Sequence, residues 1–90
     1  MSNGWYVAIM DFGFGRCMPF SGVGSPFYVD FKQIAKKHKI RVVAEVSNIP
    51  GEALDRVGES GLLMSTADRA VREKGFDAQA ALEEAFEYCL

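Results

Sequence analysis

Residues 5–12 have the sequence WYVAIMDF, and this stretch decides the fold. Aromatic and β-branched side chains dominate it, which is typical of a β-strand. The stretch is apolar almost throughout and does not alternate with polar residues. We therefore expect a strand that lies in the centre of its sheet.

The segment that follows, residues 13–25, has the sequence GFGRCMPFSGVGS. Its four glycines and one proline predict a loop, because neither residue type favours a regular element. Ser25 and Pro26 then form a typical helix start, with a side-chain cap followed by a residue that needs no amide hydrogen. The apolar residues that follow have a spacing of three and four, which predicts one buried helical face: Phe27, Tyr28, Phe31, Ile34 and Ala35.

Residues 40–46, IRVVAEV, predict a second strand in which alternate residues face the core. A strand, a helix and a strand in this order predict a parallel pair with a right-handed crossover. The later elements predicted are a turn at 47–51, a short helix at 52–58, a strand at 61–64, a helix from 65 or 66 to 74, and a final helix after 77.

The fold class that follows is α/β, as one domain over residues 1–90. We expect a small layered sandwich that opens with a β-α-β unit and has a short sheet of two or three strands and C-terminal helices. An α+β fold is the alternative.

The charges are few in total but unevenly placed. The net charge of −2 argues against a dedicated nucleic-acid-binding protein, which usually has a basic excess. A basic segment nevertheless spans residues 32–41, and it consists of Lys32, Lys36, Lys37, Lys39 and Arg41. Nucleic-acid binding through this segment is therefore the weakest of three hypotheses, and a solvated helix face explains the segment more simply.

The cysteines and the single histidine exclude the common metal sites. Cys17 and Cys89 are far apart, and only His38 could join them, so no zinc site can be assembled. We expect two free thiols in a cytoplasmic protein, with no metal and no cofactor. No apolar run approaches the length of a membrane span, so we expect no membrane partner.

A phosphate or nucleotide site in the loop between the first strand and the first helix is the second hypothesis. Ligands often lie where a strand ends and a helix begins, and backbone amides there can hold an anion. The residues that would form this site, in a phosphate binder or a small enzyme, are Asp11, Gly22, Gly24 and Ser25. The common phosphate-loop and dinucleotide motifs are both absent, however, and no set of catalytic residues can be assigned.

The leading hypothesis is a non-catalytic protein that binds another macromolecule, as an inhibitor, immunity or adaptor protein does. Aromatic residues inside a glycine-rich loop are difficult to bury, and exposed aromatics beside Arg and Met are typical of protein-binding hot spots. The expected contact residues are Phe14, Arg16, Met18 and Phe20. A protein partner is expected, and the sequence leaves a homodimer open.

Overall fold

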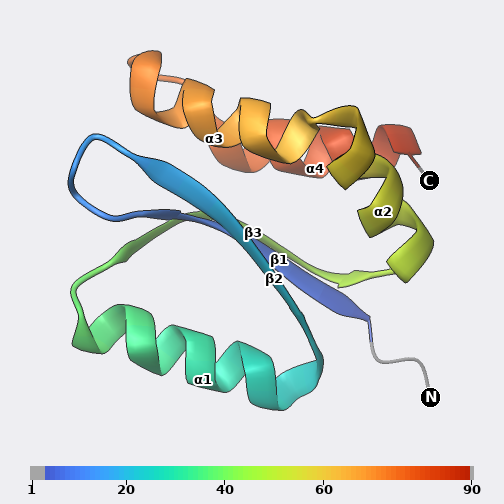
Figure 1. Ribbon diagram of the computed structural model, residues 1–90, viewed down its shortest axis with the longest axis horizontal. Coiled ribbons are helices and arrows are strands. Elements are labelled where there is room, and N and C mark those ends of the chain that lie inside the picture. The colour runs from blue at the N-terminus through green and yellow to red at the C-terminus, as the bar shows by residue number, and fades with distance from the viewer. Residues whose placement is uncertain (1–3, 90) are drawn as a thin grey trace.

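A computed structural model describes residues 4–89; of residues 24–29 and Cys89 it describes the secondary structure alone. The sheet is antiparallel with the order β2-β1-β3, and its strands are β1 (Trp5–Asp11), β2 (Cys17–Val23) and β3 (Arg41–Ile49). The helices are α1 (Gly24–Lys37), α2 (Gly51–Ser60), α3 (Leu62–Arg72) and α4 (Ala78–Cys89). Helix α1 lies on one face of the sheet, and α2, α3 and α4 cover the other (Figure 1). The predicted small layered sandwich is confirmed.

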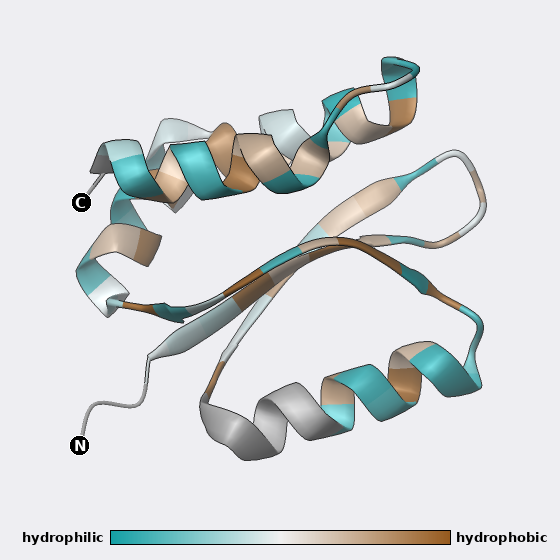
Figure 2. Ribbon diagram, turned by 180° about the vertical axis from the view of Figure 1, so that it is seen from behind, coloured by the Kyte–Doolittle hydropathy of each residue, from teal (hydrophilic) through white to brown (hydrophobic). Residues whose placement is uncertain are grey.

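The first strand is central, as its composition predicts, and it is buried on both faces. Tyr6, Ala8 and Met10 belong to a core on the side of α1, together with Phe31 and Ala35 of that helix. The intervening Val7 and Ile9 belong to a larger core on the side of the other three helices. Hydrophobic residues consequently line the strands between the two helical layers (Figure 2).

The predicted loop over residues 13–25 is wrong, because residues 17–23 form β2, which returns antiparallel to β1. Gly22 is buried and pairs with Tyr6 on the neighbouring strand. Pro19 is compatible with an edge strand, where its missing amide hydrogen can face outward. The amide of Phe12 donates to the carbonyl of Arg16. Since the backbone groups of successive strand residues point alternately toward and away from the partner strand, those of residue 19 point away from β1.

The predicted parallel pair is also wrong, since β1 and β3 are antiparallel. The hairpin reverses the chain once more before α1 begins, so β3 runs opposite to β1. The register between these strands shifts between Ile9, which pairs with Ala44, and Met10, which pairs with Val42. The extra residue, Val43, forms a bulge. As a result Val42 packs on the side of α1, whereas Ala44 packs on the opposite side.

The helices differ from the predictions mainly at residues 61–64. These residues do not form a strand, because Leu62 begins α3. Leu62 and Leu63 pack against the larger core, which also contains Ala67 one turn later. In α1, Phe31 and Ala35 are buried as predicted, but Ile34 is 54% exposed. The side chains of Ser25, Phe27 and Tyr28 lie outside the described residues. None of the described helices is long and apolar enough to cross a bilayer.

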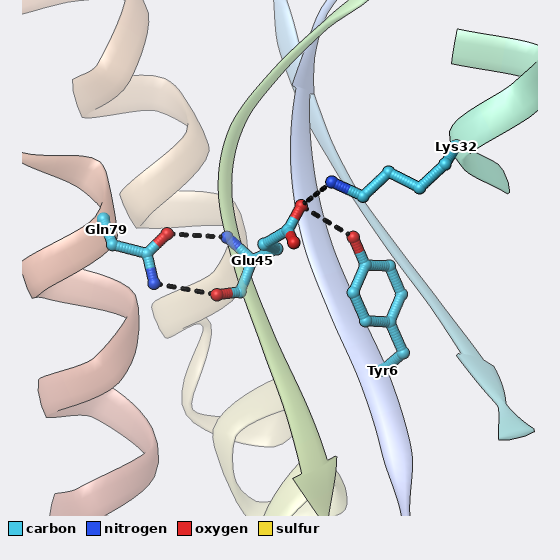
Figure 3. Close-up of polar contacts among 4 residues, drawn as sticks. All are labelled: Tyr6, Lys32, Glu45 and Gln79. Carbon is cyan, nitrogen blue, oxygen red and sulfur yellow. Dashed lines mark hydrogen bonds and ion pairs between the residues drawn. The ribbon is translucent and has the colours of Figure 1, made fainter. Parts of the chain in front are cut away.

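Glu45 on β3 connects the two helical layers through the edge of the sheet. Its carboxylate accepts a hydrogen bond from the hydroxyl of Tyr6, at 3.0 Å, and forms an ion pair with Lys32 of α1. Its backbone is held from the other side by Gln79 of α4 (Figure 3). The Gln79 carboxamide accepts from the Glu45 amide and donates to the Glu45 carbonyl, both at 2.8 Å. A side-chain amide thus takes the place of a neighbouring strand.

Replacing Gln79 by alanine should destabilise the protein by about 1–2 kcal/mol, because two hydrogen bonds to the backbone of β3 are lost. Urea denaturation followed by circular dichroism measures this change. The matched control is Gln33→Ala on the exposed side of α1, which should change the stability by less than about 0.5 kcal/mol. Equal effects of the two substitutions would show that the contact with Glu45 contributes nothing.

Candidate functional site

The turn between β1 and β2 is held in place by Asp11. One carboxylate oxygen, Oδ1, accepts from the amide of Gly13 at 2.8 Å, and the other lies 3.1 Å from Nη2 of Arg41 on β3. Gly13 and Gly15 have φ angles of +83° and +69°, in the left-handed region that favours glycine. The turn therefore has a defined shape and a fixed position relative to the sheet.

Phe14 lies between these two glycines and is 88% exposed. Phe20, the other loop phenylalanine singled out in the sequence, is half-buried and packs against the smaller core. Its ring centre lies 5.8 Å from that of Phe12 and 6.1 Å from that of Phe31. The structure therefore separates the two phenylalanines: Phe14 meets solvent, and Phe20 stabilises the packing of α1 on the sheet.

A groove of about 240 Å³ lies between the hairpin and α3, and we call it the hairpin groove. Residues 15–18 form its hairpin side, which includes the predicted contact residues Arg16 and Met18. Met64, Asp68, Val71 and Arg72 form its helical side. Met64 is 52% exposed and Val71 is 39% exposed, so the groove presents apolar surface to solvent between charged residues.

The residues on α3 were missed by the sequence reasoning. Met64, Asp68, Val71 and Arg72 are spaced by four, three and one positions, which places them on one helical face. That periodicity could have been found if residues 61–64 had been assigned to the helix. Their proximity to residues 15–18 could not be predicted from the sequence, because it depends on how α3 crosses β2.

Cys17 is buried beside the hairpin groove and is not part of a disulfide. Burial raises the pKa of its thiol, the nearby charge of Asp11 raises it further, and Arg41 partly opposes this shift. A raised pKa keeps the thiol protonated at neutral pH and makes it a poor nucleophile. Within residues 4–89 as described, no cluster of His, Cys, Asp or Glu side chains could hold a metal ion. Cys89 has no described side chain.

The residues of the phosphate-site hypothesis are not brought together. Asp11 pairs with Cys17 at one end of the hairpin, whereas Gly22 pairs with Tyr6 near the other. Five residues of strand separate these positions, which corresponds to about 17 Å. The chain reaches α1 only after β2, so the helix begins at the end of the sheet away from Asp11. The helix starts at Gly24, with Val23 as its N-cap, and the side chain of Ser25 is not described.

The basic segment is divided between two environments. Lys32 pairs with Glu45 in the middle of the structure. Lys36 and Lys37 form the last turn of α1, Lys39 lies in the turn after it, and Arg41 pairs with Asp11 at the start of β3. The part of the basic segment from residue 36 to residue 41 therefore lies at the same end of the molecule as the hairpin tip (Figure 1).

Comparison of the chain with known protein families, with curated proteins and with solved structures finds no significant match.

Removing the carboxylate with Asp11→Ala should speed hydrogen exchange of the Gly13 amide about fivefold, because a hydrogen bond worth about 1 kcal/mol is lost. Asp11→Asn is the matched control, since its oxygen can still accept from Gly13 although the charge is gone. Amide exchange measured by NMR distinguishes the two variants. Unchanged exchange in Asp11→Ala would mean that the carboxylate does not hold the turn.

The thiol of Cys17 should react slowly with Ellman's reagent in the folded protein, measured in a Cys89→Ser background. Its raised pKa predicts that the rate increases with pH only above the range of an ordinary thiol. The stability linked to this thiol is full below the unfolded-state pKa and is lost as the pH rises through the folded-state pKa. Urea-unfolded protein is the control, and equal rates in both states would contradict the burial of Cys17.

Proposed function

We propose that the protein acts by binding another protein through the hairpin surface, which consists of Phe14 and the hairpin groove. The observation that carries the proposal is the exposure of Phe14 on a turn of defined shape. A turn whose backbone is already held loses little conformational freedom on binding, and burial of the Phe14 ring in a partner removes a large apolar area from water. Inhibitor, immunity and adaptor proteins use such surfaces.

The size and composition of the hairpin groove favour a protein over a small molecule. Pockets for small ligands usually enclose about 300–1,000 Å³ and bury most of the ligand. The hairpin groove, at about 240 Å³, is smaller and open, so it suits one or two side chains of a partner. Met64 and Val71 provide apolar contacts, and the neighbouring charges resemble the polar rim of a protein interface.

We place this activity in the cytoplasm. The free thiol of Cys17 beside the surface is compatible with a reducing compartment.

Phe14→Ser should abolish or strongly weaken capture of the partner by the immobilised protein from cells that naturally contain it. Truncating an aromatic hot spot costs about 2 kcal/mol or more, which corresponds to a loss of about thirtyfold in affinity. Neither the fold nor the core depends on this side chain, so the stability in urea should stay unchanged.

Tyr88→Ser is the matched control, because Tyr88 on α4 is also an aromatic residue and is 87% exposed. Quantitative mass spectrometry of the captured proteins should show at least one protein retained by the wild type and by Tyr88→Ser but lost by Phe14→Ser. Identical profiles for all three forms would refute the proposed function.

A further inference from the structure

The charges of the chain are segregated along its long axis. Residues 11–16, 36–41 and 68–77 come from the hairpin, the end of α1 and the end of α3, and both ribbon views place them at one end of the molecule (Figures 1 and 2). We call this the basic end. It contains eight of the ten Lys and Arg residues and only four of the twelve acidic residues.

The acids at the basic end are mostly engaged. Asp11 pairs with Arg41, Glu73 pairs with Arg69, and Asp77 accepts from the amide of Ala80 at the start of α4. Within the described residues, no ion pair involves the remaining bases, which are Arg16, Lys36, Lys37, Lys39, Arg72 and Lys74. The basic end therefore has a surplus of cationic groups: Arg16 and Arg72 line the hairpin groove. The surplus also includes Lys36, Lys37 and Lys39, which lie at the end of α1 or just after it, on the face of the sheet opposite α3.

Helix stability explains only part of this surplus. Lys36, Lys37 and Arg72 lie in last helical turns, where cations interact favourably with the helix dipole. Arg16 lies on the hairpin and Lys39 lies in the turn after α1, so neither stabilises a helix in this way. Three separate elements thus direct positive charge to the same end.

We propose that the partner presents an acidic protein surface with an apolar side chain that enters the hairpin groove; this inference rests on the proposed function. The cationic groups would attract and orient the acidic surface, and Phe14, Met64 and Val71 would supply apolar contacts. A protein fits better than a nucleic acid, because Asp68 lines the groove and Phe14 is the only strongly exposed Phe, Tyr or Trp ring among the described residues of the basic end. It also fits better than a membrane, whose flat surface would not enter a groove.

The test measures binding of a fluorescein-labelled peptide in which pairs of Glu alternate with Leu, followed by fluorescence anisotropy. The same peptide with Gln in place of Glu is the uncharged comparison. We expect the acidic peptide to bind more tightly than the Gln peptide, and its affinity to fall as NaCl is raised from about 0.05 M to about 0.5 M. Phe14→Ser should weaken binding of both peptides.

A charge-removed variant, with Arg16→Gln, Lys36→Gln and Lys37→Gln, should bind the acidic peptide about fivefold to tenfold more weakly. The matched control carries Arg16→Lys, Lys36→Arg and Lys37→Arg, and should stay within about twofold of the wild type because every charge is kept. Circular dichroism of both variants serves as the folding control, and both spectra should match that of the wild type.

Three results would overturn the inference. The first is that the acidic peptide fails to bind or binds no better than the Gln peptide. The second is that oligo(dT) or vesicles of phosphatidylcholine and phosphatidylserine bind more tightly than the acidic peptide. The third is salt-sensitive self-association in sedimentation velocity, which would assign the surface to a second copy of the chain. If Phe14→Ser abolishes partner capture while the charge-removed variant does not, the proposed function stands and only the acidic character of the partner is refuted.

Discussion

The burial of β1 on both of its faces is the constraint on which the rest of the structure depends. A strand that is apolar on both of its faces cannot leave either face to water, so helices must cover the sheet on both sides. Val7 and Ile9 are fully buried, and each such side chain contributes about 1.5–3 kcal/mol by leaving water. Tyr6, Ala8 and Met10 require the same protection from α1.

Because helices cover both faces of the sheet, Glu45 on the edge strand β3 can contact both helical layers. Its side chain reaches toward α1, where Lys32 and Tyr6 satisfy it, while its backbone is bound by Gln79 of α4. One residue of β3 thus contacts elements of both helical layers. The hairpin tip, by comparison, extends beyond both cores. Phe14 can therefore face solvent without weakening the packing, and this separates the residues that stabilise the fold from those we assign to binding.

Much of the fold could be predicted from the sequence where local periodicity and composition agree. The central strand, the helix that contains Phe31 and Ala35, and the final helix capped by Asp77 all follow from short-range patterns. Strand β2 could not be predicted in this way, because glycine and proline normally interrupt strands. Gly22 pairs with Tyr6 on the neighbouring strand, and Pro19 is tolerated by its place at the edge of the sheet; both depend on the tertiary structure.

Only the hairpin side of the candidate site could be predicted from the sequence, and the α3 side could not. The sequence indicated Phe14 and Arg16, because aromatic and basic residues in a glycine-rich segment favour exposure. It also grouped Phe20 with them, although that ring packs inside. The bulge at Val43 and the passage of α3 across the hairpin have no local signal, so Met64 and Val71 become part of the site only when the three-dimensional packing is known.

The two edges of the sheet are protected by different means, and this limits how copies of the chain could join. Gln79 occupies the outer hydrogen-bonding positions of β3 at Glu45, so a foreign strand cannot pair there without displacing it. On β2, Pro19 supplies a carbonyl but no amide, and the ladder that a foreign strand could form is interrupted at its centre. The sheet thus has a local obstacle to strand addition on each of its two edges, Gln79 at Glu45 and Pro19 on β2. Its geometry therefore opposes fibre growth by repeated strand addition.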